Sequence, residues 1–350
     1  MLTLILFFQN CGKKSFEVNS NLALNSVSLS STVLPSSGVP ALPVDPGKLI
    51  TDSVFAPTSF WYTPIPIDAP VHANSANMVQ DFIQQRNTYY NSVGINTTSY
   101  SSPIFYVEAN APTVKVSPWD CQNKGYLDST LSTMWAQVPI PVNAQASAGS
   151  DMEMSVYQPS TDTLWEFWKM RKNASGDWEG CWGGRLQNVS KAQGQFTGSY
   201  GTTATSLSFI GGQITAEELR RGEIRHAIGV AMVNTTSASL YSWPAHRSDG
   251  NGAGTIPEGL RFRLDPSLDI DSLNIHPIAK IIAKAGQKYG FVVWDRAGAV
   301  SIRMQNAISY TSLGEINPYP ALFNGTLSYA ILNGVPWDRL QFLPLNYGKP

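Results

Sequence analysis

Three carboxylates stand close together in the sequence, and their spacing is typical of acid–base chemistry. Asp151 and Glu153 are two residues apart, so a strand would place both side chains on one face, and Glu166 lies on the segment expected to return beside it. Glycoside hydrolysis needs two such groups, about 5–5.5 Å apart for retention or about 6.5–9.5 Å apart for inversion. Solvated acids on the outer face of a sheet would produce the same pattern.

Tryptophans flank these carboxylates. Aromatic rings stack on sugars, but they also fill the cores of β-sandwiches, and we expect the core role for two or three of the four. The four residues are Trp165, Trp168, Trp178 and Trp182.

A second group of candidate residues follows between positions 226 and 263. Arg261 and Arg263 must share one side of a strand, and two guanidinium groups there predict an anionic partner. That partner is either a substrate carboxylate or an internal ion-pair network; the carboxylates available for such a network are Asp151, Glu153, Glu166, Asp265 and Asp269. His226 precedes an apolar run, so a buried, hydrogen-bonded histidine and a general base are both open interpretations.

The same stretch contains the residue types that β-elimination of a uronate uses. That reaction needs a base, an acid at the leaving oxygen and a cation that neutralises the carboxylate. The candidates are His226 or His246, Tyr241, and Arg261 or Arg263.

Several short strings here resemble a family of secreted bacterial proteins of uncharacterised activity. They are Gly222-x-Ile224-x-His226-Ala227, Tyr241-x-Trp243-Pro244-Ala245 with the pair His246-Arg247, Gly259-x-Arg261-x-Arg263-Leu264 with Asp269-Ile270, and Lys288-Tyr289-Gly290 with Asp295. The resemblance covers roughly residues 150–300 and implies a shared fold and site region, but no activity. The family tends to have Asp-x-His where this chain has Asp151-Met152-Glu153, and Trp-Pro-Ala-Arg-His where this chain reads Trp243-Pro244-Ala245-His246-Arg247.

Metal and cofactor motifs are weak or missing in the sequence. The four histidines are widely separated, and no cysteine pair has zinc-knuckle spacing, so we predict no transition-metal site. Phosphate-binding, dinucleotide-binding and Gly-x-Ser-x-Gly motifs are absent. Ser248–Gly252 has the oxygen-rich composition of a calcium loop, although an ordinary glycine-rich turn is the favoured interpretation.

The elements that must position these residues are mostly strands. Alternating apolar residues predict a meander over 152–157, 164–170 and 178–182, and further strands at 224–233, 260–264, 291–295 and 300–304, with the last two joined as a hairpin through 296–298. Helices are expected only over 74–90, after the capping box at 215–218, and from 275 to about 290. Many short strands with few peripheral helices predict an antiparallel β-sandwich or jelly roll.

Composition limits the class of partner. The chain has 350 residues and a formal net charge of −1, and its charged fraction of 14% lies well below the usual level of about 25%. Such a chain has no excess of positive charge to neutralise a phosphate backbone, so nucleic acid is not an expected partner.

The N-terminal sequence and the three cysteines point to an extracytoplasmic protein. An apolar run over 1–8 is followed by Gln9, Asn10 and Cys11, which predicts a lipoprotein-type signal over 1–11 with Cys11 acylated, a Ser/Pro-rich tether over 12–49 and one domain over 50–350. A short secretory signal or a chance apolar start is the alternative. The run is too short to span a bilayer, so membrane contact would be through the lipid alone. Cys121 and Cys181 then remain as a disulfide pair, with free core thiols as the alternative.

Together these features favour a carbohydrate-active protein outside the cytoplasm. The leading hypothesis is a polysaccharide hydrolase in which Asp151 and Glu166 form the acid–base pair while Trp243 and Arg261 position sugar. The alternatives are a noncatalytic glycan-binding surface lipoprotein, a polysaccharide lyase, and a structural envelope protein whose Asp, Arg and His residues form a buried network.

Overall fold

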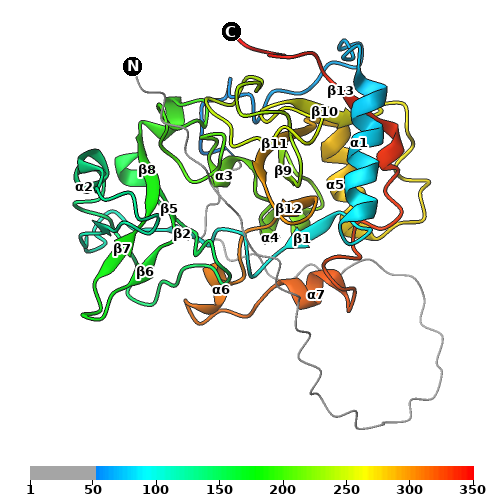
Figure 1. The fold of residues 1–350 in the computed structure, drawn as a ribbon. Helices are drawn as coiled ribbons and strands as arrows, with labels where there is room; N and C mark the ends of the chain where they lie inside the picture. The colour runs from blue at the N-terminus through cyan, green and yellow to red at the C-terminus, as the bar shows by residue number, and fades with distance from the viewer. Residues whose placement is uncertain (1–52) are drawn as a thin grey trace, which may run out of the picture.

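The largest sheet joins six strands from distant parts of the chain, in a computed structural model that describes residues 53–350 (Figure 1). Its order is β1 (Gly94–Asn96), β12 (Ser301–Arg303), β9 (Ile228–Met232), β11 (Phe291–Arg296), β10 (Arg261–Leu264) and β13 (Leu340–Phe342). The predicted signal, Cys11 and the tether over 12–49 lie outside the described residues.

Two smaller sheets form the other half of the molecule, at the left of Figure 1. The four-stranded sheet has the order β2 (Ile104–Tyr106), β4 (Met154–Gln158), β5 (Thr163–Trp168) and β8 (Trp182–Gln187). The three-stranded sheet has the order β3 (Ser117–Pro118), β7 (Trp178–Gly180) and β6 (Arg171–Lys172). The predicted meander is therefore present as β4–β5–β8, all antiparallel, although β7 joins the smaller sheet.

The expected helices are confirmed. They are α1 (Ser75–Thr88), α4 (Ala216–Arg221), which begins at the capping box of Thr215 and Glu218, and α5 (Pro277–Lys288). The remaining helices are one to two turns long: α2 (Ser129–Met134), α3 (Phe209–Gly212), α6 (Ile308–Thr311), α7 (Tyr319–Phe323), and the 3₁₀ helices Pro159–Thr161, Val189–Lys191 and Trp337–Arg339. Within residues 53–350, none combines the length and apolarity that crossing a bilayer requires.

Successive side chains along the central strands of the six-stranded sheet point to opposite faces, and each face packs into its own hydrophobic core. In β11, Phe291 and Val293 pack into the core under α1 and α5, whereas Val292 and Trp294 point the other way. The second core also includes Leu164 of β5, so the six-stranded and four-stranded sheets pack against each other through it. A third core covers the opposite side of the four-stranded sheet beneath α2.

A mainly β architecture is thus confirmed, but an antiparallel jelly roll is not. Four strand pairs are parallel: β1 with β12, β9 with β11, β2 with β4, and β3 with β7. The predicted hairpin over 291–304 is wrong, because β9 lies between β11 and β12. Every residue of β9 is buried, as expected of an interior strand covered on both faces. This strand takes the place beside β11 that β12 would have occupied in a hairpin.

The predicted disulfide is present and links the two smaller sheets. Cys121 and Cys181 are bonded with their Cα atoms 5.6 Å apart, and the bridge closes a loop across 60 positions of sequence. Cys121 follows β3, whereas Cys181 lies between β7 and β8. A disulfide is also consistent with an oxidising compartment.

We expect the double variant Cys121→Ser/Cys181→Ser to lower the free energy of unfolding by about 4 kcal/mol, because the unfolded chain regains the entropy of a 60-position loop. Urea unfolding of the full chain, followed by tryptophan fluorescence, measures this loss. An unchanged midpoint would show that the bridge contributes no stability.

Candidate functional site

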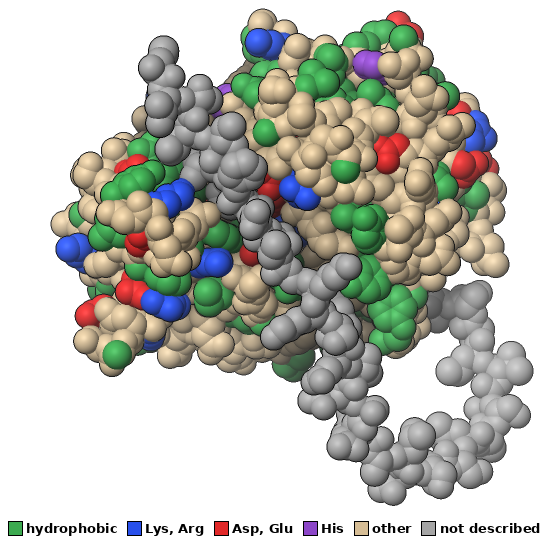
Figure 2. Space-filling model, in the orientation of Figure 1, with side chains coloured by type: hydrophobic (Ala, Val, Ile, Leu, Met, Phe, Trp, Pro, Cys, Tyr) green, Lys and Arg blue, Asp and Glu red, His purple; other side chains and the backbone are tan. Residues whose placement is uncertain are grey.

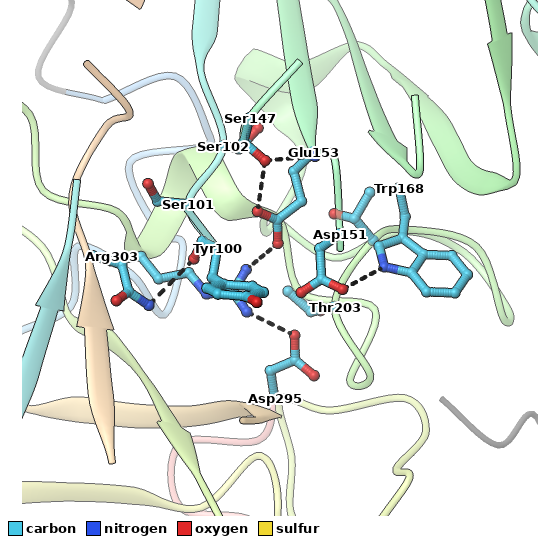
Figure 3. A network of polar contacts seen from close by, with 12 residues as sticks. Tyr100, Ser101, Ser102, Ser147, Asp151, Glu153, Trp168, Thr203, Asp295 and Arg303 are labelled. Carbon is cyan, nitrogen blue, oxygen red and sulfur yellow. Dashed lines mark hydrogen bonds and ion pairs between the residues drawn. The ribbon is translucent and has the colours of Figure 1, made fainter. Parts of the chain in front are cut away.

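A buried guanidinium joins the six-stranded and four-stranded sheets. The side chain of Arg303, on β12, is 2% exposed and forms ion pairs with Glu153 and, at 3.3 Å, with Asp295 (Figure 3). Glu153 immediately precedes β4 of the four-stranded sheet, whereas Asp295 belongs to β11 of the six-stranded sheet. Arg303 therefore connects carboxylates from both sheets at their junction.

Asp151 completes this group on the side of Trp168. The Trp168 Nε1–H donates to Asp151 Oδ1 at 3.2 Å, and Figure 3 shows the Asp151 carboxylate between this indole and Arg303. Asp151 also contributes to the electrostatic field at Arg303, as Glu153 does. Asp151 and Glu153 thus both lie near Arg303, but they precede β4 instead of sharing one face of that strand as their spacing predicted.

Burial shifts the proton affinity of the carboxyl groups around Arg303. Removal from water raises the pKa of Glu153 to about 7, although the neighbouring Arg303 opposes the shift. Burial likewise raises the pKa of Asp295 to about 7. Arg303 opposes this rise, whereas the negative charges of Asp249 and Asp151 add to it. Acids with strongly displaced pKa values are typical of functional sites, although structural ion-pair networks share this property.

Glu166, which the sequence predicts as the acid–base partner of Asp151, lies in a separate hydrogen-bond network. Its Oε1 accepts hydrogen bonds from Ser208 Oγ at 2.6 Å and from the Ile210 amide at 3.2 Å, and its Oε2 accepts one from Thr202 Oγ1 at 3.0 Å. The side chain is fully buried, and burial raises its pKa to about 7. Within residues 53–350, none of its hydrogen bonds reaches Asp151, because the 202–210 segment supplies all its donors and covers it.

His226 is a buried structural histidine, one of the two interpretations left open by its sequence. Its Nε2 lies 3.1 Å from Glu218 Oε1, and its Nδ1 lies 2.8 Å from the Ala227 carbonyl oxygen. Burial disfavours the charged ring, but the Glu218 carboxylate outweighs that effect, so the pKa of His226 is raised. The ring therefore ties the start of β9 to α4.

The internal ion-pair network considered for Arg261 and Arg263 does not form among the described residues, whereas a substrate carboxylate as their partner stays a prediction. Arg261 Nη2 donates to the Tyr289 carbonyl at 2.8 Å, and Arg263 donates to the Pro66 and Ile67 carbonyls at 2.6 and 2.9 Å. Neither has an ion pair within the described residues. Backbone carbonyls accept most of these guanidinium hydrogen bonds because the chain before α1 runs across β10, although Arg261 Nε has no partner among the described residues.

The remaining predicted binding residues have separate surroundings. Tyr241 is exposed, Trp243 packs edge-on against Phe60 with ring centroids 5.5 Å apart, and the His246 Nδ1 lies 3.0 Å from the Phe196 carbonyl oxygen. None of the contacts within residues 53–350 joins these three side chains to His226.

The tryptophans near the carboxylates divide as expected between core and surface. Trp165 and Trp182 are buried, whereas Trp168 and Trp178 are half-buried and carry Lys169 and Lys172 against their rings, at 4.8 and 5.0 Å. Figure 2 shows charged side chains gathered on the half of this face that holds the two smaller sheets. Trp168 thus combines a hydrogen bond to Asp151 with a half-buried ring packed against Lys169.

Sequence reasoning did not identify the central residue of the site. Asp295 entered only through the family resemblance, and Arg303 was treated as part of an ordinary strand. The available signal was a charged residue inside each of two apolar runs, 291–295 and 300–304, in a chain with few charges. No protein family, curated protein or solved structure matches this chain.

We expect Arg303→Met to lower the free energy of unfolding by about 3–5 kcal/mol, because it leaves two buried carboxylates without their cation. Arg339→Met is the matched control: its ion pair with Asp265, at 2.5 Å, involves an Arg side chain that is 46% exposed, and we expect it to cost about 0–1 kcal/mol. Urea unfolding measures both losses. Equal losses in the two variants would contradict a central role for Arg303.

Stability should fall as the pH rises from about 5 to about 7, because the folded chain binds more protons than the unfolded chain in this window. Glu153, Glu166 and Asp295 have folded-state pKa values raised to about 7, well above those of an unfolded chain. The raised pKa of His226 acts in the same direction, because its stabilisation is present at low pH and is lost as the ring deprotonates.

Urea midpoints measured across this pH range test the prediction. Glu166→Gln should weaken the dependence by removing one titrating group, whereas Glu108→Gln, at an exposed position, serves as its control. Stability that rises with pH between about 5 and 7 would contradict the raised pKa values.

Proposed function

We propose that the protein is a carbohydrate-active hydrolase in which Asp151 and Asp295 are the acid–base pair. One observation carries the proposal: Asp295 of β11 is paired with a buried guanidinium, near which Asp151 is hydrogen-bonded to a half-buried tryptophan (Figure 3). Asp295 takes the role that sequence reasoning assigned to Glu166.

The surroundings of the two carboxyl groups support different roles. Asp295 has a pKa raised to about 7 by burial, so it holds a proton near neutral pH and can donate it to a glycosidic oxygen. Asp151 accepts a hydrogen bond from Trp168, which fixes the carboxylate for the role of base or nucleophile. The Trp168 ring is the surface on which a sugar would stack.

The other candidate functions have less support. The residues considered for a lyase are engaged in separate structural contacts, including the His226 ion pair with Glu218 and the carbonyl contacts of Arg261. A lectin would need the half-buried tryptophans but not the carboxylates. A structural protein would contain the same buried network, so measured activity is what separates these classes.

Lipid anchoring at Cys11 and an extracytoplasmic location remain part of this proposal. The disulfide fits the extracytoplasmic location, since disulfides persist in oxidising compartments. A polysaccharide or cell-surface glycan is the substrate class that fits this location.

A panel of neutral and acidic polysaccharides incubated with the purified full chain should release reducing sugars. Asp151→Asn and Asp295→Asn should each lower the rate by about 10²–10⁴-fold, which is the usual contribution of a general acid or base. The rate should also decline above about pH 7 as Asp295 loses its proton.

Glu166→Gln is the matched control, because it alters a buried carboxylate outside the proposed pair and should keep most of the activity. Circular dichroism establishes that each variant is folded. Full activity in both aspartate variants would reject the assignment. A rate lost in Asp151→Asn and Glu166→Gln but kept in Asp295→Asn would restore the original pair.

A further inference from the structure

Two half-buried tryptophans near Asp151 each hold a basic side chain against the ring. The guanidinium carbon of Arg171 lies 3.6 Å from the ring centroid of Trp119, and the ammonium of Lys169 lies 4.8 Å from that of Trp168. We call these four side chains the Trp119–Trp168 surface. The Arg171 side chain is 47% exposed, so this surface borders solvent.

Hydrogen bonds tie the Trp119–Trp168 surface to Asp151. The Trp119 Nε1–H donates to the Lys169 carbonyl at 3.1 Å, and the Lys169 amide donates to the Asp151 carbonyl at 2.7 Å. The Trp168 Nε1–H donates to Asp151 Oδ1 at 3.2 Å, with the carboxylate lying between this indole and Arg303 in Figure 3. The surface therefore adjoins the carboxylate that we propose as base or nucleophile.

The backbone at Lys169 places its side chain on the Trp168 ring. Successive residues of an extended strand point to opposite faces, so Lys169 would otherwise lie on the other side of the sheet from Trp168. Lys169 instead adopts a left-handed conformation with φ = 51°, and Met152, whose carbonyl accepts a hydrogen bond from the Met170 amide, has φ = 42°. Such conformations are unfavourable for residues other than glycine and occur preferentially at ligand-binding sites.

Lys169 supplies a positive charge that no carboxylate pairs with among residues 53–350. The neighbouring cation is already neutralised, because Arg171 forms an ion pair with Glu179 at 2.6 Å. An ammonium on an aromatic face near solvent is held weakly, so it can turn toward an anion beside the ring. Because indole faces also stack on sugars, this surface is complementary to a sugar that carries a negative charge.

We propose that the Trp119–Trp168 surface binds an anionic polysaccharide, with sugar rings on the indoles and the Lys169 ammonium on a carboxylate or sulfate group. Both anionic groups fit, because an ammonium recognises either one as a point charge. This inference rests on the proposed function, whose substrate class it names. Recognition is local, since the formal net charge of −1 gives the whole chain no attraction for a polyanion.

Calorimetric titration of the full chain with anionic polysaccharides tests the proposal. The probes are polygalacturonate, alginate and dextran sulfate, and their neutral counterparts are the two carboxyl-reduced polymers and dextran. At least one anionic polymer should bind more tightly than its neutral counterpart, and its affinity should fall as sodium chloride is added, because salt screens exposed charges. Binding of the uronate polymers indicates a carboxylate ligand, whereas binding of dextran sulfate alone indicates a sulfate.

Lys169→Met should raise the Kd for the anionic polymer about fivefold and reduce its salt dependence, because it removes one exposed charge from the complex. Lys169→Arg keeps that charge and should keep the affinity. Lys172→Met is the matched control: the Lys172 ammonium lies 5.0 Å from the ring centroid of Trp178, but it follows Arg171 on β6 and so points to the opposite face of that sheet. Thermal unfolding establishes that each variant is folded.

Three results would each overturn the proposal. They are failure of all three anionic polymers to bind, binding no tighter than that of the neutral counterparts, and equal affinities of Lys169→Met and Lys172→Met. Anionic binding without release of reducing sugar would reject hydrolysis and leave glycan binding at this surface. Hydrolysis of neutral polysaccharides alone, without anionic binding, would reject this surface and leave the proposed hydrolase.

Discussion

The junction of the six-stranded and four-stranded sheets depends on the ion pairs of the buried Arg303 guanidinium. A charge removed from water must be paired, and here the partners come from both sides, Glu153 before β4 and Asp295 on β11. The ring of Phe209 lies 4.7 Å from the guanidinium and that of Trp294 lies 5.8 Å away. The arginine is therefore enclosed by carboxylates and aromatic faces, and the two sheets cannot move apart without exposing all of them.

Close backbone packing around Trp294 allows this enclosure. A Cβ at Gly229 of β9 would lie 2.3 Å from the indole, and a Cβ at Gly212 of α3 would lie 2.6 Å from it. Only glycine lets the strand and the helix approach the ring this closely. The same approach brings the 202–210 segment over Glu166, so the donors that satisfy this carboxylate are positioned by packing at Trp294.

Buried carboxyl groups are concentrated at this junction. Burial raises the pKa of Glu153 and of Asp295 to about 7, which supplies a proton donor near neutral pH. Buried carboxyl groups continue into the loop of Asp249 and Glu258, where Arg296 Nη1 donates to the Asp249 carbonyl at 3.2 Å and lies 3.9 Å from Asp249 Oδ2.

Local sequence determined the helices over 75–88 and 277–288, the capping box at Thr215, the β4–β5 hairpin and the pairing of Cys121 with Cys181. Periodicity, capping residues and turns act over a few positions, and only two cysteines remained to pair. Tertiary structure alone decided that β9 separates β11 from β12, that carbonyls satisfy Arg263, and that Arg303 meets Glu153 across 150 positions. These outcomes depend on which distant segments share a core, because a buried charge takes whatever partner the packing brings to it.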